Sequence, residues 1–364
     1  MIYLDYQATT PLAPEALQAM LPWLQSQHAN PHSAHAPGRA ARAAVAVARD
    51  QVAALLPDHG DVNFTSGATE ALNWAIKGVG PGRIVTIATE HAAVLDTVEA
   101  LRARGGDVVV LPVGGDGIVD LDAARSAIVP DTVLVAAMLV NNEIGVIQPV
   151  EELAALAHGA GALFLCDAVQ GYGRVRIPDV CDLIAMSAHK IHGPKGIGAL
   201  WIRDGVTLTP LLHGGGQEAG GRSGTLSPAL CAGFGAAAKL AKERFGADHA
   251  HVEQLFRDAI AHLGPEWVLN GSRDHRYHGN LNLRREGLDV ARLMSELRDI
   301  AFSAGSACAS GSGRASHVLR AIGLTEAQAR SSIRLGFGRY TTDEELMTAL
   351  DRIDAAARAQ RVAA

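Results

Sequence analysis

Residues 183–196, LIAMSAHKIHGPKG, contain a short apolar run that leads into a lysine and a Gly-Pro-Lys-Gly turn. The run Leu183–Met186 predicts a buried strand, because it is continuous and apolar. Lys190 follows just past its end, where open α/β sheets place their chemistry. A partly desolvated lysine loses its proton readily and can form a Schiff base, which an arginine cannot do. A solvated loop lysine is the simpler interpretation, so the surroundings of Lys190 must decide.

Short apolar runs alternate with helical segments from residue 62 to about residue 203. These runs are 62–64, 83–88, 107–113, 132–139, 162–166, 183–186 and 198–202. Continuous apolar strands between helices are typical of a sheet that is buried on both faces and is mostly parallel. We therefore predict an α/β fold whose large domain has a mostly parallel sheet between helices.

The rest of the chain predicts two further parts. Residues 1–13 form an extended N-terminal arm that packs with the small domain, and residues 14–250 form the large domain. Residues 251–364 form a smaller α+β domain that carries the Cys308 loop and Arg334. The elements expected outside the sheet are helices at 14–25, 38–56, 228–262, 290–298 and 342–362, and strands at 280–283 and 333–337.

Composition excludes several classes of protein. The formal net charge of −6 and the lack of a basic run argue against nucleic acid or an anionic membrane as a partner. No apolar stretch reaches the roughly 18 residues of a membrane span, and the first residues do not resemble a signal peptide. The cysteines lack C-x-x-C spacing, which makes zinc and a disulfide framework poor expectations. We expect a cytoplasmic protein.

Polar groups follow five of the seven strands of the predicted sheet. They are the turn 65–70, Glu90 and His91, residues 141–143, Asp167 and Gln170, and Ser187, His189 and Lys190. Because the carboxyl ends of parallel strands share one edge of a sheet, we expect these groups to converge. The turn 65–70 opens a helix, whose free N–H groups and positive dipole end suit a phosphate; a plain capped helix start is the competing interpretation.

These groups together predict a pyridoxal phosphate (PLP) site in the large domain. Lys190 would form the imine, and Asp167 would pair with the ring nitrogen and keep it protonated. Asp167 follows an apolar run, so it should be partly buried and needs a cationic partner. His91 could stack on the ring, although a helix-capping histidine is its simpler interpretation.

Two candidates lie in the C-terminal part. Cys308 stands in a stretch of Gly, Ser and Ala that would keep its thiol exposed and mobile, so that the thiolate could form and attack. A free surface thiol is the alternative. Arg334 lies on a predicted strand with apolar neighbours, and a buried arginine needs an anion. That anion could be a substrate carboxylate or an internal salt-bridge partner.

Stretches spread over nearly the whole chain resemble the cysteine desulfurases of the NifS/IscS type, within the class V aminotransferases of the type I PLP fold. These stretches are Leu4–Pro11, Thr65–Glu70, Asn141–Gly145, Ser187–Lys190, Arg222–Thr225, Gly305–Cys308 and Ser332–Arg334. The resemblance implies PLP-dependent removal of sulfur from L-cysteine, which gives L-alanine and a persulfide on Cys308. It also implies a homodimer and a sulfur-acceptor or scaffold protein, for iron–sulfur cluster assembly or thiolation.

The resemblance implies a role for each site residue. Lys190, Cys308 and His91 would be catalytic, and His91 would stack on the ring. Cofactor-binding residues would be Lys190, Ala68, Thr69, Asn142, Asp167, Gln170, Ser187, His189 and Thr225. Thr225 would reach the site of the other subunit. Asn142 and Arg334 would hold the substrate carboxylate.

Some alternatives stay open at this stage. A selenocysteine lyase or another class V aminotransferase would share most of these residues, and a dimeric scaffold without catalytic activity would share the fold. After Cys308 the chain reads ASGSGRASH, where relatives often have Leu-Glu-Pro before the Ser-His. No metal ligand set is predicted, apart from Cys308 as a possible transient ligand of an iron–sulfur cluster.

Overall fold

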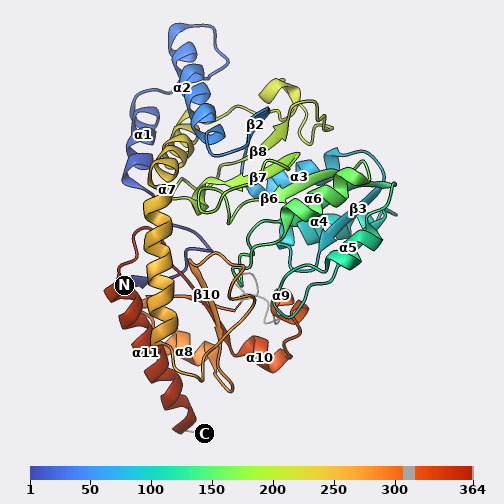
Figure 1. The fold of residues 1–364 in the computed structure, drawn as a ribbon. Coiled ribbons are helices and arrows are strands. Elements are labelled where there is room, and N and C mark those ends of the chain that lie inside the picture. The colour runs from blue at the N-terminus through green and yellow to red at the C-terminus, as the bar shows by residue number, and fades with distance from the viewer. Residues whose placement is uncertain (306–315, 363–364) are drawn as a thin grey trace.

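The computed structural model describes residues 1–305 and 316–362. A large sheet lies between layers of helices, and a smaller sheet around β10 lies below it in the view of Figure 1. The long helix α7 (Pro228–His262) runs alongside both sheets. None of the described helices is long and apolar enough to cross a lipid bilayer.

Among the described residues, the large sheet has seven strands in the order β2-β8-β7-β6-β5-β3-β4. The strands are β2 (Gly60–Thr65), β3 (Arg83–Ile87), β4 (Val108–Leu111), β5 (Thr132–Met138), β6 (Leu163–Asp167), β7 (Leu183–Ser187) and β8 (Gly198–Arg203). All neighbouring pairs are parallel except those of β8, which runs antiparallel to β7 and β2. The predicted mostly parallel sheet is confirmed.

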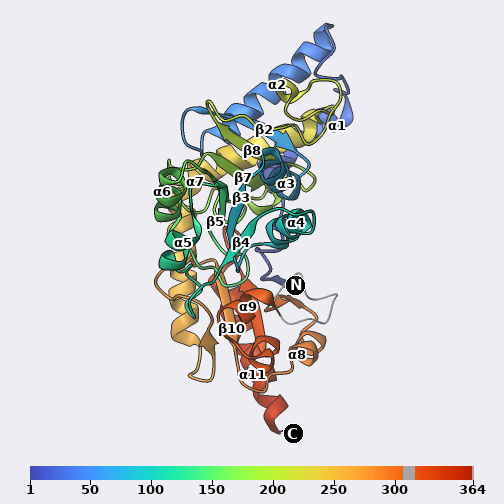
Figure 2. The ribbon, with the colours of Figure 1, turned by 90° about the vertical axis from the view of Figure 1, so that its right-hand side faces the viewer.

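Helices cover both faces of this sheet (Figure 2). The residues of β5 show the consequence, because Leu134 and Ala136 pack with one helical layer while Val135 and Ala137 pack with the other. One layer contains α3 (Ala68–Gly78) and α4 (Ala92–Arg102). The other contains α2 (Ala36–Ala53), α6 (Val150–Gly159) and α7, with α1 (Pro14–Gln25) packed on α7 and α5 (Leu121–Ala127) next to α6. Burial on both faces explains why the strands are continuously apolar.

The smaller sheet is antiparallel, with the order β12-β13-β10-β9. Its strands are β9 (Val268–Leu269), β10 (Asn280–Arg284), β12 (Ser303–Ala304) and β13 (Ser332–Gly336). The helices around it are α8 (Val290–Glu296), α9 (His317–Ala321), α10 (Glu326–Arg330) and α11 (Asp343–Val362). Because α7 continues past residue 250, the predicted boundary there falls inside a helix; the domain limits remain a prediction.

The N-terminal arm joins the two sheets. Its strand β1 (Ile2–Tyr3) pairs in parallel with β11 (Ile300–Ala301), and Asp5 forms an isolated bridge to Gly336 of β13. Further along, the backbone amide of Thr10 donates to the carbonyl of His189 at 3.0 Å. The arm therefore passes from the smaller sheet to the loop that follows β7.

Candidate active site

A cavity of about 500 Å³ lies at the carboxyl edge of the large sheet. Most of the predicted site residues line it: Ala68, Thr69, His91, Asn142, Asp167, Gln170, Ser187, His189, Lys190 and Arg334. Its volume lies in the range of small-molecule sites. Thr225 is exposed and does not line this cavity, and Cys308 lies outside the described residues. The strand ends therefore converge as their parallel order predicts.

The start of α3 supplies the anion-binding part of the cavity. Its N-cap is Gly67, and no side chain caps the first turn. The carboxylate of Glu70 receives the Ser66 amide at 2.8 Å, and it is also bound by Arg222 at 2.6 Å, so an arginine neutralises its charge. An uncapped helix N-terminus next to a cavity suits a phosphate group.

Lys190 ends a short 3-10 turn, Ala188–Lys190, directly after β7. Its Nζ donates to the carbonyl oxygens of Gln7 at 2.6 Å and Ala8 at 2.8 Å, both in the N-terminal arm. Burial lowers the pKa of Lys190 to about 7, with further lowering by the charges of Arg174 and Arg334. The amine is therefore not that of a solvated loop lysine, and at neutral pH a large fraction of it is a nucleophilic free base.

Asp167 is the last residue of β6, and its carboxylate is buried. Its Oδ1 accepts the Val169 amide at 2.9 Å, and among the described residues no lysine or arginine forms an ion pair with it. Burial raises the pKa of Asp167, while the Val169 amide and the charges of His91 and Lys190 oppose that change. A buried carboxylate facing a cavity is stabilised by a cationic ligand group such as a pyridinium nitrogen.

His91 fits both of its sequence-based interpretations. It is the N-cap of α4, where its Nδ1 accepts the Ala93 amide at 3.0 Å, and it also lines the cavity. Because Nδ1 is an acceptor, the proton of the neutral ring is on Nε2. Burial lowers the pKa of His91, so the neutral ring is favoured.

Arg334 also fits both of its interpretations. It is fully buried on β13, and its Nη2 donates to Asp5 Oδ1 at 2.8 Å while Nη1 donates to the Asn142 carbonyl at 3.0 Å. Its Nε has no acceptor among the described residues, although this atom is buried. Arg334 therefore has an internal salt bridge and still has donors left for a carboxylate in the cavity.

Pattern reasoning missed some groups around Lys190. The carbonyls of Gln7 and Ala8 belong to the backbone, so they could not be predicted from residue type. Arg174 donates to the carbonyl of Lys190 at 2.6 Å and to Gln170 Oε1 at 2.7 Å. The only available signal for Arg174 was its place four residues after Gln170.

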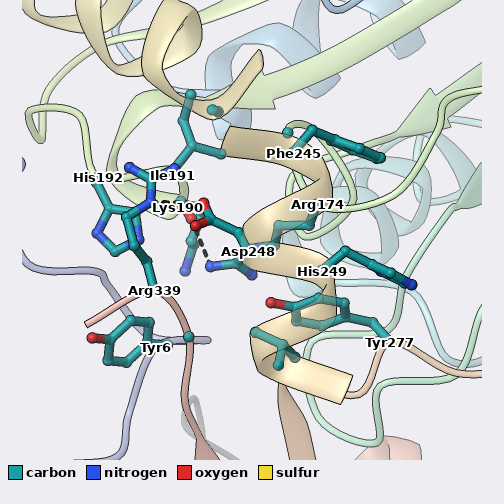
Figure 3. Close-up of a pocket in the computed structure, with 14 residues that line it drawn as sticks. Tyr6, Arg174, Lys190, Ile191, His192, Phe245, Asp248, His249, Tyr277 and Arg339 are labelled. Atoms are coloured by element: carbon teal, nitrogen blue, oxygen red, sulfur yellow. Dashed lines mark hydrogen bonds and ion pairs between the residues drawn. The ribbon is translucent and has the colours of Figure 1, made fainter. Parts of the chain in front are cut away.

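A second, much smaller cavity of about 40 Å³ lies beside the Lys190 loop (Figure 3). Asp248 and His249 of α7 line one side of it, and Arg174, Tyr277 and Arg339 also contribute. This volume has room for a water molecule or two but for no substrate. Among the described residues, no group of three His, Cys, Asp or Glu side chains is placed to hold a metal ion.

Comparison with known proteins agrees with this fold. Residues 2–348 match the class-V aminotransferase family, and the chain belongs to that family. It is 45% identical to the cysteine desulfurase IscS of Rickettsia bellii (strain OSU 85-389) over 361 residues, which cover 95% of this chain and 88% of that protein. It is also 45% identical to the probable mitochondrial cysteine desulfurase of Schizosaccharomyces pombe, covering 97% of this chain and 73% of that protein. Within the class-V aminotransferases, the chain is thus a cysteine desulfurase, as the resemblance implied.

Solved structures support the same assignment. A NifS-like protein superposes with a TM-score of 0.89 at 32% sequence identity, covering 97% of this chain and 98% of that one. SspA, solved in complex with cysteine, superposes with a TM-score of 0.83 at 36% identity, covering 94% of this chain and all of that one (100%).

Proposed function

We propose that this cysteine desulfurase uses PLP to take sulfur from L-cysteine, releases L-alanine, and keeps the sulfur as a persulfide on Cys308 for transfer to an acceptor. The observation that carries the proposal is the shared cavity in which the Lys190 amine, the buried Asp167 carboxylate and the uncapped start of α3 meet. The similar structure of SspA was solved with cysteine, which supports cysteine as the substrate.

The residues that line the cavity fit PLP by their chemistry. Lys190 would hold its aldehyde carbon, Asp167 its ring nitrogen and Gln170 its phenolic oxygen, while His91 would stack on the ring. The phosphate would be held by Ala68, Thr69, Ser187 and His189, and by Thr225 of the other subunit. When bound, PLP supplies an electron sink for the α-carbon of the amino acid.

The side chains of this chain would then do the following work. Arg334 and Asn142 bind the α-carboxylate and fix the amino acid in the cavity. The Lys190 amine, once free, removes the α-proton and can return it, because a pKa lowered to about 7 lets it exchange a proton near neutral pH. The ring of His91 is close enough to the cavity to assist proton transfers.

The sulfur step would be carried out by Cys308. Its thiolate attacks the substrate sulfur, so that an S–S bond forms while the C–S bond of the substrate breaks. The electron pair of the broken bond stays with carbon, which takes a proton, and the product is L-alanine. Because Cys308 and the substrate supply all the atoms and electrons, the step needs no external oxidant or reductant.

The variant Cys308→Ser tests this proposal. It should bind PLP and L-cysteine and show the same changes in visible absorbance as the wild-type protein, but it should form no L-alanine at a useful rate. Cys231→Ala, which changes a buried thiol on α7, serves as the control and should keep turnover. Normal alanine formation by the Cys308→Ser variant would remove Cys308 from the mechanism.

We also propose a cytoplasmic homodimer that passes sulfur to an acceptor or scaffold protein, for iron–sulfur cluster assembly or for thiolation. Capture of partners that become persulfidated in the presence of L-cysteine would identify the acceptor. Release of selenium from selenocysteine but no sulfur from cysteine would favour a selenocysteine lyase. Amino-group transfer to 2-oxo acids without sulfur release would favour an aminotransferase, and a protein that binds no PLP would favour a scaffold.

A further inference from the structure

Arg174 connects three parts of the site through its hydrogen bonds. Its Nη1 donates to Gln170 Oε1 at 2.7 Å, and its Nη2 donates to the carbonyl of Lys190 at 2.6 Å. The Nε2 of Gln170 donates to the Gln7 carbonyl at 2.9 Å, and this carbonyl also accepts Lys190 Nζ. These bonds close a ring that holds the loop of Lys190, the side chain of Gln170 and the N-terminal arm against one another.

The contact with Arg174 decides which way the amide of Gln170 points. A guanidinium has only donors, so the group facing it must be the amide oxygen. The amide nitrogen then faces the Gln7 carbonyl and the cavity, and one of its two N–H bonds is left after the bond to Gln7. Gln170 thus presents a donor, and no acceptor, to an oxygen of a ligand in the cavity.

Arg174 brings a positive charge to the site without a carboxylate to balance it. Among the described residues it forms no ion pair; it also lies against the ring of Tyr277, whose centroid is 5.4 Å from the guanidinium carbon, and Tyr6 and Arg339 line the same small cavity. Figure 3 shows it in the small cavity beside Lys190. The charges that act on the Lys190 amine come from Arg174, from Arg334 on β13, from Asp5 in the arm and from Asp167 on β6. His91 and His189 line the large cavity, and burial lowers the pKa of both, which favours their neutral rings.

We propose that Arg174 is a positioning residue of the PLP site, which orients Gln170 as a donor toward the phenolic oxygen of the cofactor and places an unbalanced positive charge beside Lys190. Both effects favour loss of a proton from the Lys190–cofactor unit, because a donor stabilises the oxygen anion and a like charge disfavours a second cation. The proposal rests on the PLP binding proposed above.

The test is a pH titration of visible absorbance in the PLP-bound protein. Arg174→Met removes the charge and the donors and keeps a side chain of similar length. We expect this variant to raise the pH midpoint of the absorbance change by about one unit. Arg174→Lys keeps a charge and a donor, so it should stay close to the wild-type midpoint. Arg339→Met is the matched control, because Arg339 also lines the small cavity but its ion pair is with Asp248, and among the described residues it forms no hydrogen bond with Gln170 or Lys190. In that variant Asp248, the ion-pair partner of Arg339, still forms an ion pair with Arg244, so its carboxylate is not left unpaired.

The outcomes separate the possible explanations. A role limited to the fold would lower the melting temperature of Arg174→Met while its midpoint stays at the wild-type value, and this result would overturn the proposal. An equal shift in Arg339→Met would also overturn it, because any buried arginine nearby would then suffice. Gln170→Ala combined with Arg174→Met should shift the midpoint by less than the sum of the single changes. If the wild-type protein binds no PLP, the proposed function itself is wrong. If both proteins bind PLP and Arg174→Met has the wild-type pH midpoint, only the role of Arg174 is rejected.

Discussion

At the scale of single residues, the site depends on Lys190 being uncharged for part of the time. Burial and the charges of Arg174 and Arg334 favour the neutral amine, while Asp5 and Asp167 favour the ammonium form. The two arm carbonyls that accept Nζ also bind the ammonium form well. The balance gives a lysine that can exchange its proton near neutral pH, as a base that both takes and returns a proton requires.

This balance predicts how PLP capture depends on pH. Only the free amine reacts with the aldehyde, and the pKa of Lys190 is lowered to about 7. In PLP-free protein, the rate at which visible absorbance develops should therefore be low at pH 6 and should rise through pH 7 to a plateau near pH 8.5. Lys190→Ala should show no such pH-dependent signal. A rate that keeps rising up to pH 10 would mean that Lys190 behaves as a solvated lysine.

The salt bridge between Arg334 and Asp5 leads to a second prediction. Asp5 holds Nη2 of Arg334 at 2.8 Å and the hydroxyl of Ser303 at 2.9 Å, so it fixes the arginine that would bind the substrate carboxylate. Asp5→Ala should raise KM for L-cysteine by roughly tenfold with a smaller change in kcat, because a charged hydrogen bond is worth about 1.5–3 kcal/mol. Asp5→Asn keeps an acceptor and should have a smaller effect. A lower KM would show that Asp5 competes with the substrate.

Residue types predicted much of the site, and the reason is chemical. Burying an ionisable side chain costs free energy unless a partner or ligand compensates. The positions of Lys190, Asp167, His91 and Arg334 after or within apolar runs were therefore informative. The Gln7 carbonyl could not be predicted in this way, because every residue has one. Arg174 lies in a segment that is neither strand nor helix, so no periodicity placed it beside Gln170.

At the scale of elements, the order of the strands brings the site together. The apolar runs predicted the sheet and its largely parallel direction, because burial on both faces leaves a clear signal. The antiparallel direction of β8 was not predictable, since an apolar strand has the same pattern in either direction. The two-residue strands β1, β9, β11 and β12 are too short to show any period. They depend on tertiary contacts for their formation.

Strand β8 also supports the turn at the start of α3, which gives a prediction about Gly198. A Cβ added there would lie 2.5 Å from the carbonyl oxygen of Met186 and 2.7 Å from the carbonyl carbon of Gly67. Gly198→Ala should therefore displace the turn before Ala68 and weaken PLP binding, at a stability cost of about 1–3 kcal/mol. Fluorescence titration with PLP and thermal melting would measure the two effects.

The control for this change is Gly80→Ala. A Cβ at Gly80 meets nothing within 4 Å, so PLP affinity and melting temperature should stay close to the wild-type values. Unchanged PLP affinity in Gly198→Ala, together with lowered stability, would mean that the backbone yields on the side of Met186 and leaves the turn in place.

At the scale of the whole molecule, the cavity draws on both sheets and on the arm. Arg334 comes from the smaller sheet, Lys190 from the turn that follows β7 of the larger sheet, and Gln7 and Ala8 from the arm that runs between the two sheets. Thr225 is the exception, because it is exposed and does not line the cavity of its own chain. The resemblance assigned it to the site of the other subunit, and its exposure leaves it accessible to a second copy.

A mixed dimer would test this assignment. Suppose that one subunit carries Lys190→Ala and the other carries Thr225→Ala. If Thr225 acts across the interface, one of the two sites combines the wild-type Lys190 of one subunit with the wild-type Thr225 of the other, and the second site contains both changes. Differently tagged subunits that are produced together should then give heterodimers with half the wild-type amount of tightly bound PLP. Each variant alone should give a homodimer with weak or no binding. If Thr225 acts within its own chain, neither site of the heterodimer is intact, so PLP binding should stay as weak as in the Thr225→Ala homodimer.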